Sequence, residues 1–253
     1  MTARGRSVGR RRAPVVASLV AASLVAASVV LAACGGSSSA GTPSTGGGSD
    51  DFAGYVRRPV RSVRGVSLPS ADGTTVAMPA VPGGLRLVYF GYTSCPDVCP
   101  TTMADIARAV RSLPAADRGR VQVAMVSIDP ARDSAAKLAG YVSTFVPDGE
   151  ALRTDDDAAL RAAARAFGAD YEVRPGADGQ PEVSHTSDVF VVDDTGEIVL
   201  AWPFGTSSRS IAADIRRLLS GERPPGLDAA TRATTSTTAT SPTATTVAAG
   251  GSG

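Results

Sequence analysis

The stretch from Leu85 to Leu113, LRLVYFGYTSCPDVCPTTMADIARAVRSL, decides the fold. It opens with a nearly continuous apolar run, Leu85 to Tyr92, which is typical of a strand that is covered on both faces of a sheet. Apolar residues then recur at helical spacing, at Cys99, Met103, Ile106, Ala107, Val110 and Leu113. A buried strand that leads straight into an amphipathic helix is the first half of a βαβ unit, so the sequence predicts an α/β fold.

The rest of the chain continues this alternation. A second buried strand is expected over 121–128, and the apolar spacing predicts helices near 138–145 and 160–167, the second ended by Gly168. The pattern then changes to two strands, 188–192 and 197–202, joined by the turn DDTG, and to a last helix over 211–219 that ends at Gly221. A βαβ unit followed by a β-hairpin and a helix predicts a thioredoxin-like fold, with a central mixed sheet flanked by helices.

The first 33 residues favour an export signal. Residues 1–14 hold five Arg and no acid, and residues 15–33 carry no charge, which is a basic region followed by an apolar one. The sequence LAAC that ends at Cys34 resembles the lipobox of bacterial lipoproteins, in which the chain is cut before a Cys that then receives lipid. We therefore expect a lipoprotein signal peptide over 1–33 and an anchor on Cys34 at the extracytoplasmic face of the cell membrane. A retained transmembrane anchor is the alternative, because nineteen apolar residues can span a bilayer.

The remaining domain boundaries follow from composition. Residues 34–55 are expected to be the lipidated Cys and a flexible Gly/Ser-rich linker, and residues 56–221 the folded domain. Residues 222–253, rich in Thr, Ala, Ser and Pro, predict a disordered tail, which is either plain or O-glycosylated. Without the five Arg of the signal, 20 basic side chains face 24 acidic ones, a net charge of −4. This balance gives no basic patch for nucleic acid.

The two cysteines of GYTSCPDVCP, Cys95 and Cys99, admit three interpretations: a structural clip, a redox couple or half of a metal site. A disulfide that closes so short a ring is a weak staple, worth about 2 kcal/mol. Pro96 or Pro100 is expected at the first helical position, which would place both sulfurs near a helix N-terminus. There the helix dipole favours the thiolate, the form that attacks disulfides and binds metal. The three-residue spacing, wider than in redox thioredoxins, puts both sulfurs on one helical face without excluding a disulfide.

The chain has one His, His185, just before the strand expected at Asp188. In a thioredoxin-like fold the loop before that strand lies against the cysteine loop, so two thiolates and an imidazole are expected to converge. Taken alone, a single His is more often an ordinary hydrogen-bonded residue. Soft thiolates with one imidazole suit copper, as Cu(I) or Cu(II), whereas structural zinc normally takes four protein ligands and would need an Asp to join. Haem attachment needs Cys-x-x-Cys-His, which is absent.

Three ordered motifs resemble the Sco/SenC family: GYTSCPDVCPTTM (91–103), SIDPARDS (127–134) and SHTSDVFVVDDTGEIV (184–199). The family consists of membrane-tethered, thioredoxin-like copper proteins that help to assemble the binuclear copper site of cytochrome c oxidase. The resemblance implies that Cys95, Cys99 and His185 bind copper, and that an N-terminal β-hairpin precedes the first core strand.

Three acids near these motifs are candidate modulators. For Asp129 and Asp133 the favoured interpretation is local: Asp129 caps a helix that starts at Pro130, and Asp133 adds charge to its first turn. The alternative is that they tune the metal or its docking surface. Under the same alternative, Asp97, between the cysteines, would contact a partner rather than the ion.

The resemblance implies a copper metallochaperone, rather than an enzyme, that serves the copper-binding subunit of cytochrome c oxidase. The alternative is a thiol-disulfide oxidoreductase that keeps the cysteines of that subunit reduced and is itself recharged by a thioredoxin-like reductant. A peroxidase-like function is disfavoured, because the run Thr93-Ser94-Cys95 does not place a Thr at the expected spacing. A lipoprotein with an inert disulfide is the remaining interpretation.

Overall fold

The computed structural model describes residues 51–176 and 179–227. The expected signal peptide (1–33), Cys34, the Gly/Ser-rich run to residue 50 and the tail from residue 228 lie outside the described residues. Within the part that is described, the structure contains no helix long and apolar enough to cross a membrane.

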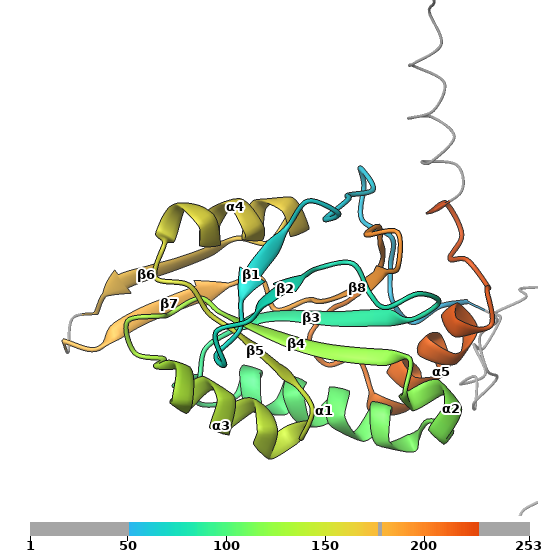
Figure 1. The fold of residues 1–253 in the computed structure, drawn as a ribbon, viewed down its shortest axis with the longest axis horizontal. Coiled ribbons are helices and arrows are strands. Elements are labelled where there is room, and N and C mark those ends of the chain that lie inside the picture. Colours follow the sequence, from blue (N-terminus) through green and yellow to red (C-terminus); the bar gives the residue numbers. More distant parts are fainter. Residues whose placement is uncertain (1–50, 177–178, 228–253) are drawn as a thin grey trace, which may run out of the picture. The chain divides into compact units, whose positions relative to one another are not determined.

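A five-stranded mixed sheet forms the centre of the described fold (Figure 1). The strand order is β5-β4-β3-β8-β9, in which β3, β4 and β5 are parallel and β8 and β9 are antiparallel to their neighbours. Every residue of β3 is buried, which explains the continuous apolar run there. The predicted mixed sheet is confirmed, with these strand bounds: β3 Leu85–Gly91, β4 Val121–Ser127, β5 Glu150–Leu152, β8 Val189–Asp193 and β9 Ile198–Trp202.

Helices cover both faces of this sheet (Figure 1). One face packs against α1 (Val98–Ser112), α3 (Ala135–Phe145) and α5 (Ser208–Leu219), which bury side chains such as Met103, Leu138 and Ile215 in a single apolar cluster. The other face packs against α4 (Asp157–Phe167), where Phe167 meets Phe90 and Phe190 edge to face. A short helix, α2 (Ala115–Arg118), follows α1. The sheet is therefore the middle layer of three.

The N-terminal part of the described chain lies against the sheet. As expected, it contains a β-hairpin, formed by β1 (Ser67–Pro69) and β2 (Thr75–Ala77). Before it, Tyr55 exchanges two 2.9 Å backbone hydrogen bonds with Ala201 of β9. This segment covers the outer edge of the sheet, which would otherwise be open to pairing with another chain.

The packed part of the chain extends past residues 56–221 at both ends. The backbone N–H groups of Ala53 and Gly54 donate to the carboxylate of Asp214, at 3.1 and 3.0 Å. Beyond α5, Leu227 is only 2% exposed and belongs to the apolar cluster under that helix. Residues 51–55 and 222–227, which composition assigned to linker and tail, thus lie in the fold.

A second hairpin was missed in the sequence. Strands β6 (Tyr171–Pro175) and β7 (Pro181–His185) form a separate antiparallel pair that projects from the sheet at the left of Figure 1. Its residues are mostly exposed or half-buried, so no apolar periodicity marks it. We call this element the histidine hairpin, because His185 is its last residue.

Candidate metal centre

The cysteine loop, residues 92–97, connects β3 to α1. Cys95 lies in this loop and Cys99 is the second residue of α1, so the two are not a pair within one helix as expected. Val98 takes the first helical position that we assigned to Pro96 or Pro100. The sulfurs are still brought together, because the backbone N–H of Cys99 donates to Sγ of Cys95 at 3.3 Å. The loop thus wraps the first cysteine onto the N-terminus of the helix.

The two thiols lie in different environments. Cys95 is half-buried; burial alone would raise its pKa, but the backbone N–H groups of Cys99 and Asp97 outweigh burial and lower it below its usual value. Cys99 is fully buried, and burial raises its pKa to about 12. The expectation of an activated thiolate therefore fits Cys95 and is wrong for Cys99. Both sulfurs are free thiols in this structure.

His185 approaches the cysteines although it lies far from them in the sequence. Its Nε2 lies 3.8 Å from Sγ of Cys99, across 86 positions of chain. Its Nδ1 lies 2.9 Å from the carbonyl oxygen of Thr186 and donates to it, which leaves the lone pair on Nε2, the atom that faces the sulfur. Burial lowers the pKa of the imidazole, so the ring is neutral near pH 7. The expected convergence of this His with Cys99 is present.

The separation of these donor atoms suits a shared ion. Two ligands bound at about 2.0–2.3 Å to one metal lie roughly 3.5–4 Å apart, and Sγ of Cys99 and Nε2 of His185 meet that condition. A complete three-ligand cluster of Cys, His, Asp or Glu is not assembled among the described residues. Cys95 would have to turn towards the other two to complete the set.

Two tyrosines of the strand and loop surround these groups. The rings of Tyr89 and Tyr92 each stand edge to face with the imidazole of His185, with ring centroids 6.0 Å apart. The hydroxyl of Tyr89 donates to Sγ of Cys99 at 3.4 Å. Sequence reasoning missed both, because an aromatic side chain in an apolar run predicts only core packing.

Comparison with known proteins identifies the chain. The SCO1/SenC family model matches residues 62–220, more than half of the sequence. This chain belongs to the SCO1/SenC family. It is 35% identical over 128 residues to protein SenC of Rhodobacter capsulatus, an alignment that covers 50% of this chain and 57% of that one. In general it spans about half to two thirds of the length of the curated relatives it matches.

Solved structures of Sco proteins share the fold. Apo Sco1 of Thermus thermophilus is 32% identical, with a TM-score of 0.58 over 68% of this chain and 99% of that one. ScoI of Bradyrhizobium japonicum, solved with copper bound, is 30% identical, with a TM-score of 0.54 over 60% of this chain and 96% of that one. The thioredoxin-like prediction is thereby confirmed.

In this SCO1/SenC chain a buried carboxylate anchors the cysteine loop. Asp133 is 0% exposed, and it accepts hydrogen bonds from the backbone N–H of Thr93 at 3.1 Å, from the Thr93 hydroxyl and from the Ser127 hydroxyl at 2.7 Å. The favoured local interpretation is wrong, because α3 starts at Ala135 and Ser134 is its N-cap. Asp133 instead ties the loop to the end of β4.

The other two acids take different places. Asp129 is buried and pairs with Arg132, whose guanidinium also lies 5.7 Å from the centre of the Tyr92 ring. It caps no helix, so that expectation is also wrong. Asp97 is exposed at the N-cap position of α1 without a capping hydrogen bond of its own, and it accepts one from the Thr101 hydroxyl at 3.3 Å. Neither acid is placed within the Cys99–His185 pair.

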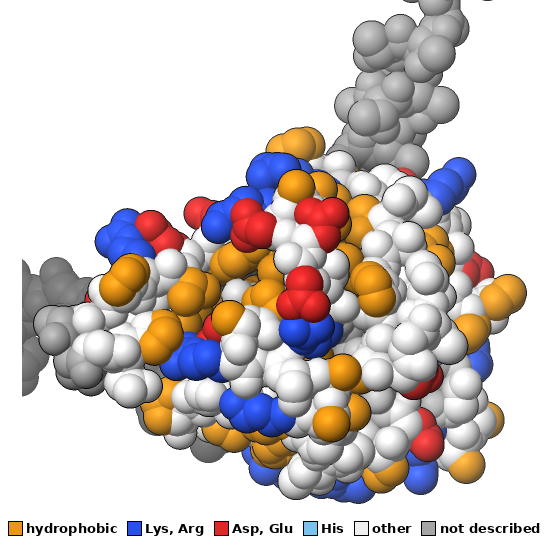
Figure 2. All heavy atoms as spheres, turned by 60° about the vertical axis from the view of Figure 1, so that its left-hand side comes forward, with side chains coloured by type: hydrophobic (Ala, Val, Ile, Leu, Met, Phe, Trp, Pro, Cys, Tyr) orange, Lys and Arg blue, Asp and Glu red, His pale blue; other side chains and the backbone are white. Residues whose placement is uncertain are grey.

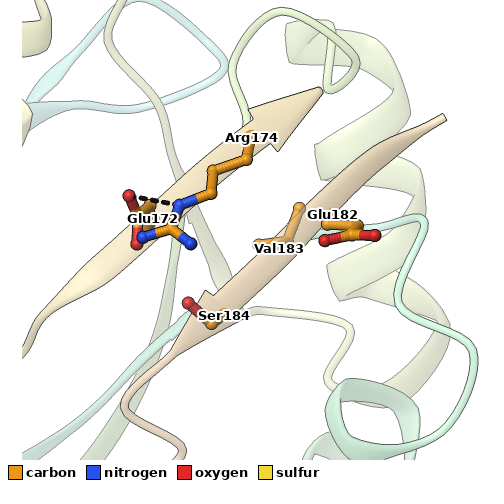
Figure 3. Close-up of a pocket in the computed structure, with 5 residues that line it drawn as sticks. All are labelled: Glu172, Arg174, Glu182, Val183 and Ser184. Atoms are coloured by element: carbon orange, nitrogen blue, oxygen red, sulfur yellow. Dashed lines mark ion pairs between the residues drawn. The ribbon is translucent and has the colours of Figure 1, made fainter. Parts of the chain in front are cut away.

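The outer face of the histidine hairpin is polar. A hollow of about 250 Å³ lies over it, lined by Glu172, Arg174, Glu182, Val183 and Ser184 (Figure 3). Arg174 points to Glu172 and pairs with it at 2.6 Å. In the side view of Figure 2, acidic, basic and apolar side chains are interspersed over the surface. The cysteines and the histidine do not line this hollow.

Proposed function

We propose that the protein is a copper carrier that binds copper through Cys95, Cys99 and His185 and delivers it to the binuclear copper site of cytochrome c oxidase. The 3.8 Å approach of Cys99 Sγ and His185 Nε2 carries this proposal, because it joins a thiol and an imidazole from distant parts of the chain. Soft sulfur with one imidazole suits copper, whereas structural zinc sites use four protein ligands. Beyond Cys34, the sequence offers two Cys and one His.

Family membership supports both cargo and recipient. The ScoI relative was solved with copper bound, and the sequence motifs of this chain resemble those of proteins that serve cytochrome c oxidase. We also propose that a lipid on Cys34 holds the domain at the extracytoplasmic face of the membrane, where the copper-binding subunit of the oxidase presents its site. The Gly/Ser-rich run after Cys34 would give the domain reach along that surface.

The three proposed ligands have different roles in binding and releasing copper. His185 offers Nε2, because Thr186 fixes the proton on Nδ1. Cys99 supplies the buried sulfur, and Cys95 supplies the half-buried one at the surface. A recipient's ligand therefore has access to copper from the side of Cys95.

The test is a Cu(I) titration of the reduced protein by competition with a chromophoric chelator. One copper per chain is expected, with a large loss of affinity in Cys95→Ser and Cys99→Ser. His185→Ala is expected to weaken binding at least tenfold, because one of three ligands is removed. Glu182→Ala, on the exposed face of the same hairpin, is the matched control and should bind as the wild type does. Unchanged stoichiometry and affinity in His185→Ala would remove the His from the site.

A second function, thiol-disulfide reduction, is favoured by the contrast between the two thiols. The accessible, low-pKa Cys95 would attack a substrate disulfide and release one substrate thiolate, forming a mixed disulfide. Cys99, after losing its proton, would attack Cys95 Sγ and release the second thiolate, leaving a Cys95–Cys99 disulfide. A thioredoxin-like reductant would return two electrons and two protons. In this case a strain carrying His185→Ala should still assemble a fully metallated oxidase.

A further inference from the structure

Tyr89 is a buried polar group that the proposed function leaves unused. It lies in β3 and is 0% exposed, yet its hydroxyl donates to Sγ of Cys99 at 3.4 Å and its ring packs edge to face against His185. One side chain therefore contacts two of the three proposed copper ligands. Because β3 is the central strand of the sheet, this side chain is held by the most buried part of the fold.

The hydrogen bond from Tyr89 responds to the state of the sulfur. A thiol or disulfide sulfur is a weak acceptor, so a buried hydroxyl gains little from it. A thiolate sulfur, including one bound to a metal, keeps negative charge and is a stronger, charge-assisted acceptor. Burial raises the pKa of Tyr89, so the phenol keeps its proton and stays a donor. Because burial also raises the pKa of Cys99 to about 12, its sulfur is a neutral thiol in the metal-free protein and becomes a thiolate when a metal binds. The bond is thus stronger in the metal-bound site than in the metal-free thiols or the disulfide.

We propose that Tyr89 is a positioning residue that holds Cys99 Sγ by its hydroxyl and packs edge to face against the His185 ring, and so favours the copper-bound site over the metal-free thiols. This inference rests on the proposed function, because the thiolate of Cys99 forms when the metal binds.

Tyr141 on α3 provides a matched control. Its hydroxyl oxygen is also buried. Burial is the main cause that raises the pKa of Tyr141, and the charges of the two nearby cysteines raise this pKa further. Unlike Tyr89, this hydroxyl has no hydrogen-bond partner among the described residues. The substitutions Tyr89→Phe and Tyr141→Phe each delete one buried hydroxyl beside the sulfurs, and only the first deletes a hydrogen bond to Cys99.

The experiment titrates reduced wild type, Tyr89→Phe and Tyr141→Phe with Cu(I) in competition with a chromophoric chelator. Tyr89→Phe should lower the Cu(I) affinity about three- to tenfold, because the hydrogen bond to the copper-bound thiolate is lost. Tyr141→Phe should stay within twofold of the wild type, because it deletes no hydrogen bond to Cys99.

Equal Cu(I) affinities for Tyr89→Phe and a copper-binding wild type overturn the inference and leave the proposed function standing. A wild type that binds no Cu(I) overturns the proposed function and, with it, this inference. If Tyr89→Phe does not fold, the hydroxyl proton of Tyr89 is followed by NMR in the reduced wild type. Slow exchange with water and contacts to the β protons of Cys99 are expected, and a rapidly exchanging hydroxyl proton overturns the inference.

Discussion

The cysteine loop and the histidine hairpin, which together supply the three proposed ligands, differ in how deeply they are buried. The buried Asp133 accepts hydrogen bonds that tie the loop to the end of β4, and Cys99 on the following helix is completely buried. The hairpin projects from the sheet, and Val173 on β6 is 39% exposed. At its base, Thr186 and Asp170 exchange hydrogen bonds of 2.9 and 3.0 Å. The sulfur of Cys99 is thus part of the core and the half-buried Cys95 packs against it, whereas the imidazole is carried by an element with little buried area.

This difference indicates how a carrier could hold a tight-binding ion and still release it. Local opening costs least where few apolar contacts are buried, so the hairpin should open before the loop does. The imidazole would then leave the ion first, while the sulfurs keep their positions.

The largest expected effect separates the two thiols of the loop itself. In metal-free, reduced protein at pH 7.5, Cys95 should react with N-ethylmaleimide at least about a thousandfold faster than Cys99, since only the thiolate reacts. The reason is that burial raises the pKa of Cys99 to about 12, whereas that of Cys95 lies below its usual value. Raising the pH to 9 should speed the reaction of Cys95 and leave Cys99 far slower. Peptide mass spectrometry after timed alkylation measures both rates, and similar rates would contradict the described environments.

Removing the carboxylate of Asp133 should loosen the cysteine loop. Asp133→Ala leaves the N–H and hydroxyl of Thr93 and the hydroxyl of Ser127 without their acceptor, so the free energy of unfolding should fall by about 2–4 kcal/mol. Urea denaturation measures the loss. Glu182→Ala on the hairpin is the control, with a change within about 0.5 kcal/mol because its side chain is exposed. Equal small losses in the two variants would show that the loop is not anchored by this carboxylate.

Crowding at Gly91 should move the buried sulfur with a smaller loss of stability. A Cβ at this position would lie 2.7 Å from the ring of Tyr89 and 3.1 Å from Sγ of Cys99, so Gly91→Ala should cost about 1–3 kcal/mol and weaken metal binding. Gly140 on α3 has nothing within 4 Å of such an atom, and Gly140→Ala should stabilise by up to about 1 kcal/mol. Thermal unfolding of the pair tests both signs. A neutral or stabilising Gly91→Ala would rule out the close approach.

Sequence reasoning predicted the strand and helix that flank the cysteine loop better than it predicted the histidine hairpin. The strand that ends at Gly91 and the helix that contains Cys99 carry strong apolar periodicity, and both are present close to the expected bounds. The histidine hairpin is mostly exposed, with only Val173 and Val183 as aliphatic side chains, so no alternating pattern marks it. The meeting of His185 with Cys99 was expected from the fold order and the family resemblance, and could not have come from local pattern.

The roles of single polar side chains depended on contacts that a linear pattern does not contain. Asp133 bonds to Thr93 across 40 positions, and a local capping interpretation was therefore preferred and wrong. Tyr89 lies in an apolar run, where its hydroxyl gives no sign of a partner on the next helix. Gly91 offered one usable signal, because a glycine at the end of a buried strand often marks a close approach of another group.

The smallest expected effect is a pH dependence of stability caused by the histidine hairpin, because His185 is the only His of the chain. Burial lowers its pKa in the folded protein, so below about pH 6.5 the unfolded chain binds a proton on this ring that the folded chain does not. Stability should therefore be unaffected by this group above pH 7 and should fall as the pH drops from 6.5 towards 5.5. The slope cannot exceed one proton, about 1.4 kcal/mol per pH unit.

Urea denaturation of the metal-free protein between pH 5.5 and 7.5 measures this slope, and His185→Gln should flatten it because no other side chain has an ordinary pKa in that window. If the hairpin opens locally before the domain unfolds, the ring can take up its proton in the native state and the global slope becomes smaller than the burial of the ring implies. An NMR titration of the imidazole then gives a midpoint closer to that of a free His. A steep global slope with a strongly lowered midpoint would instead mean that the hairpin is held as firmly as the cysteine loop, and the proposed order of release would fail.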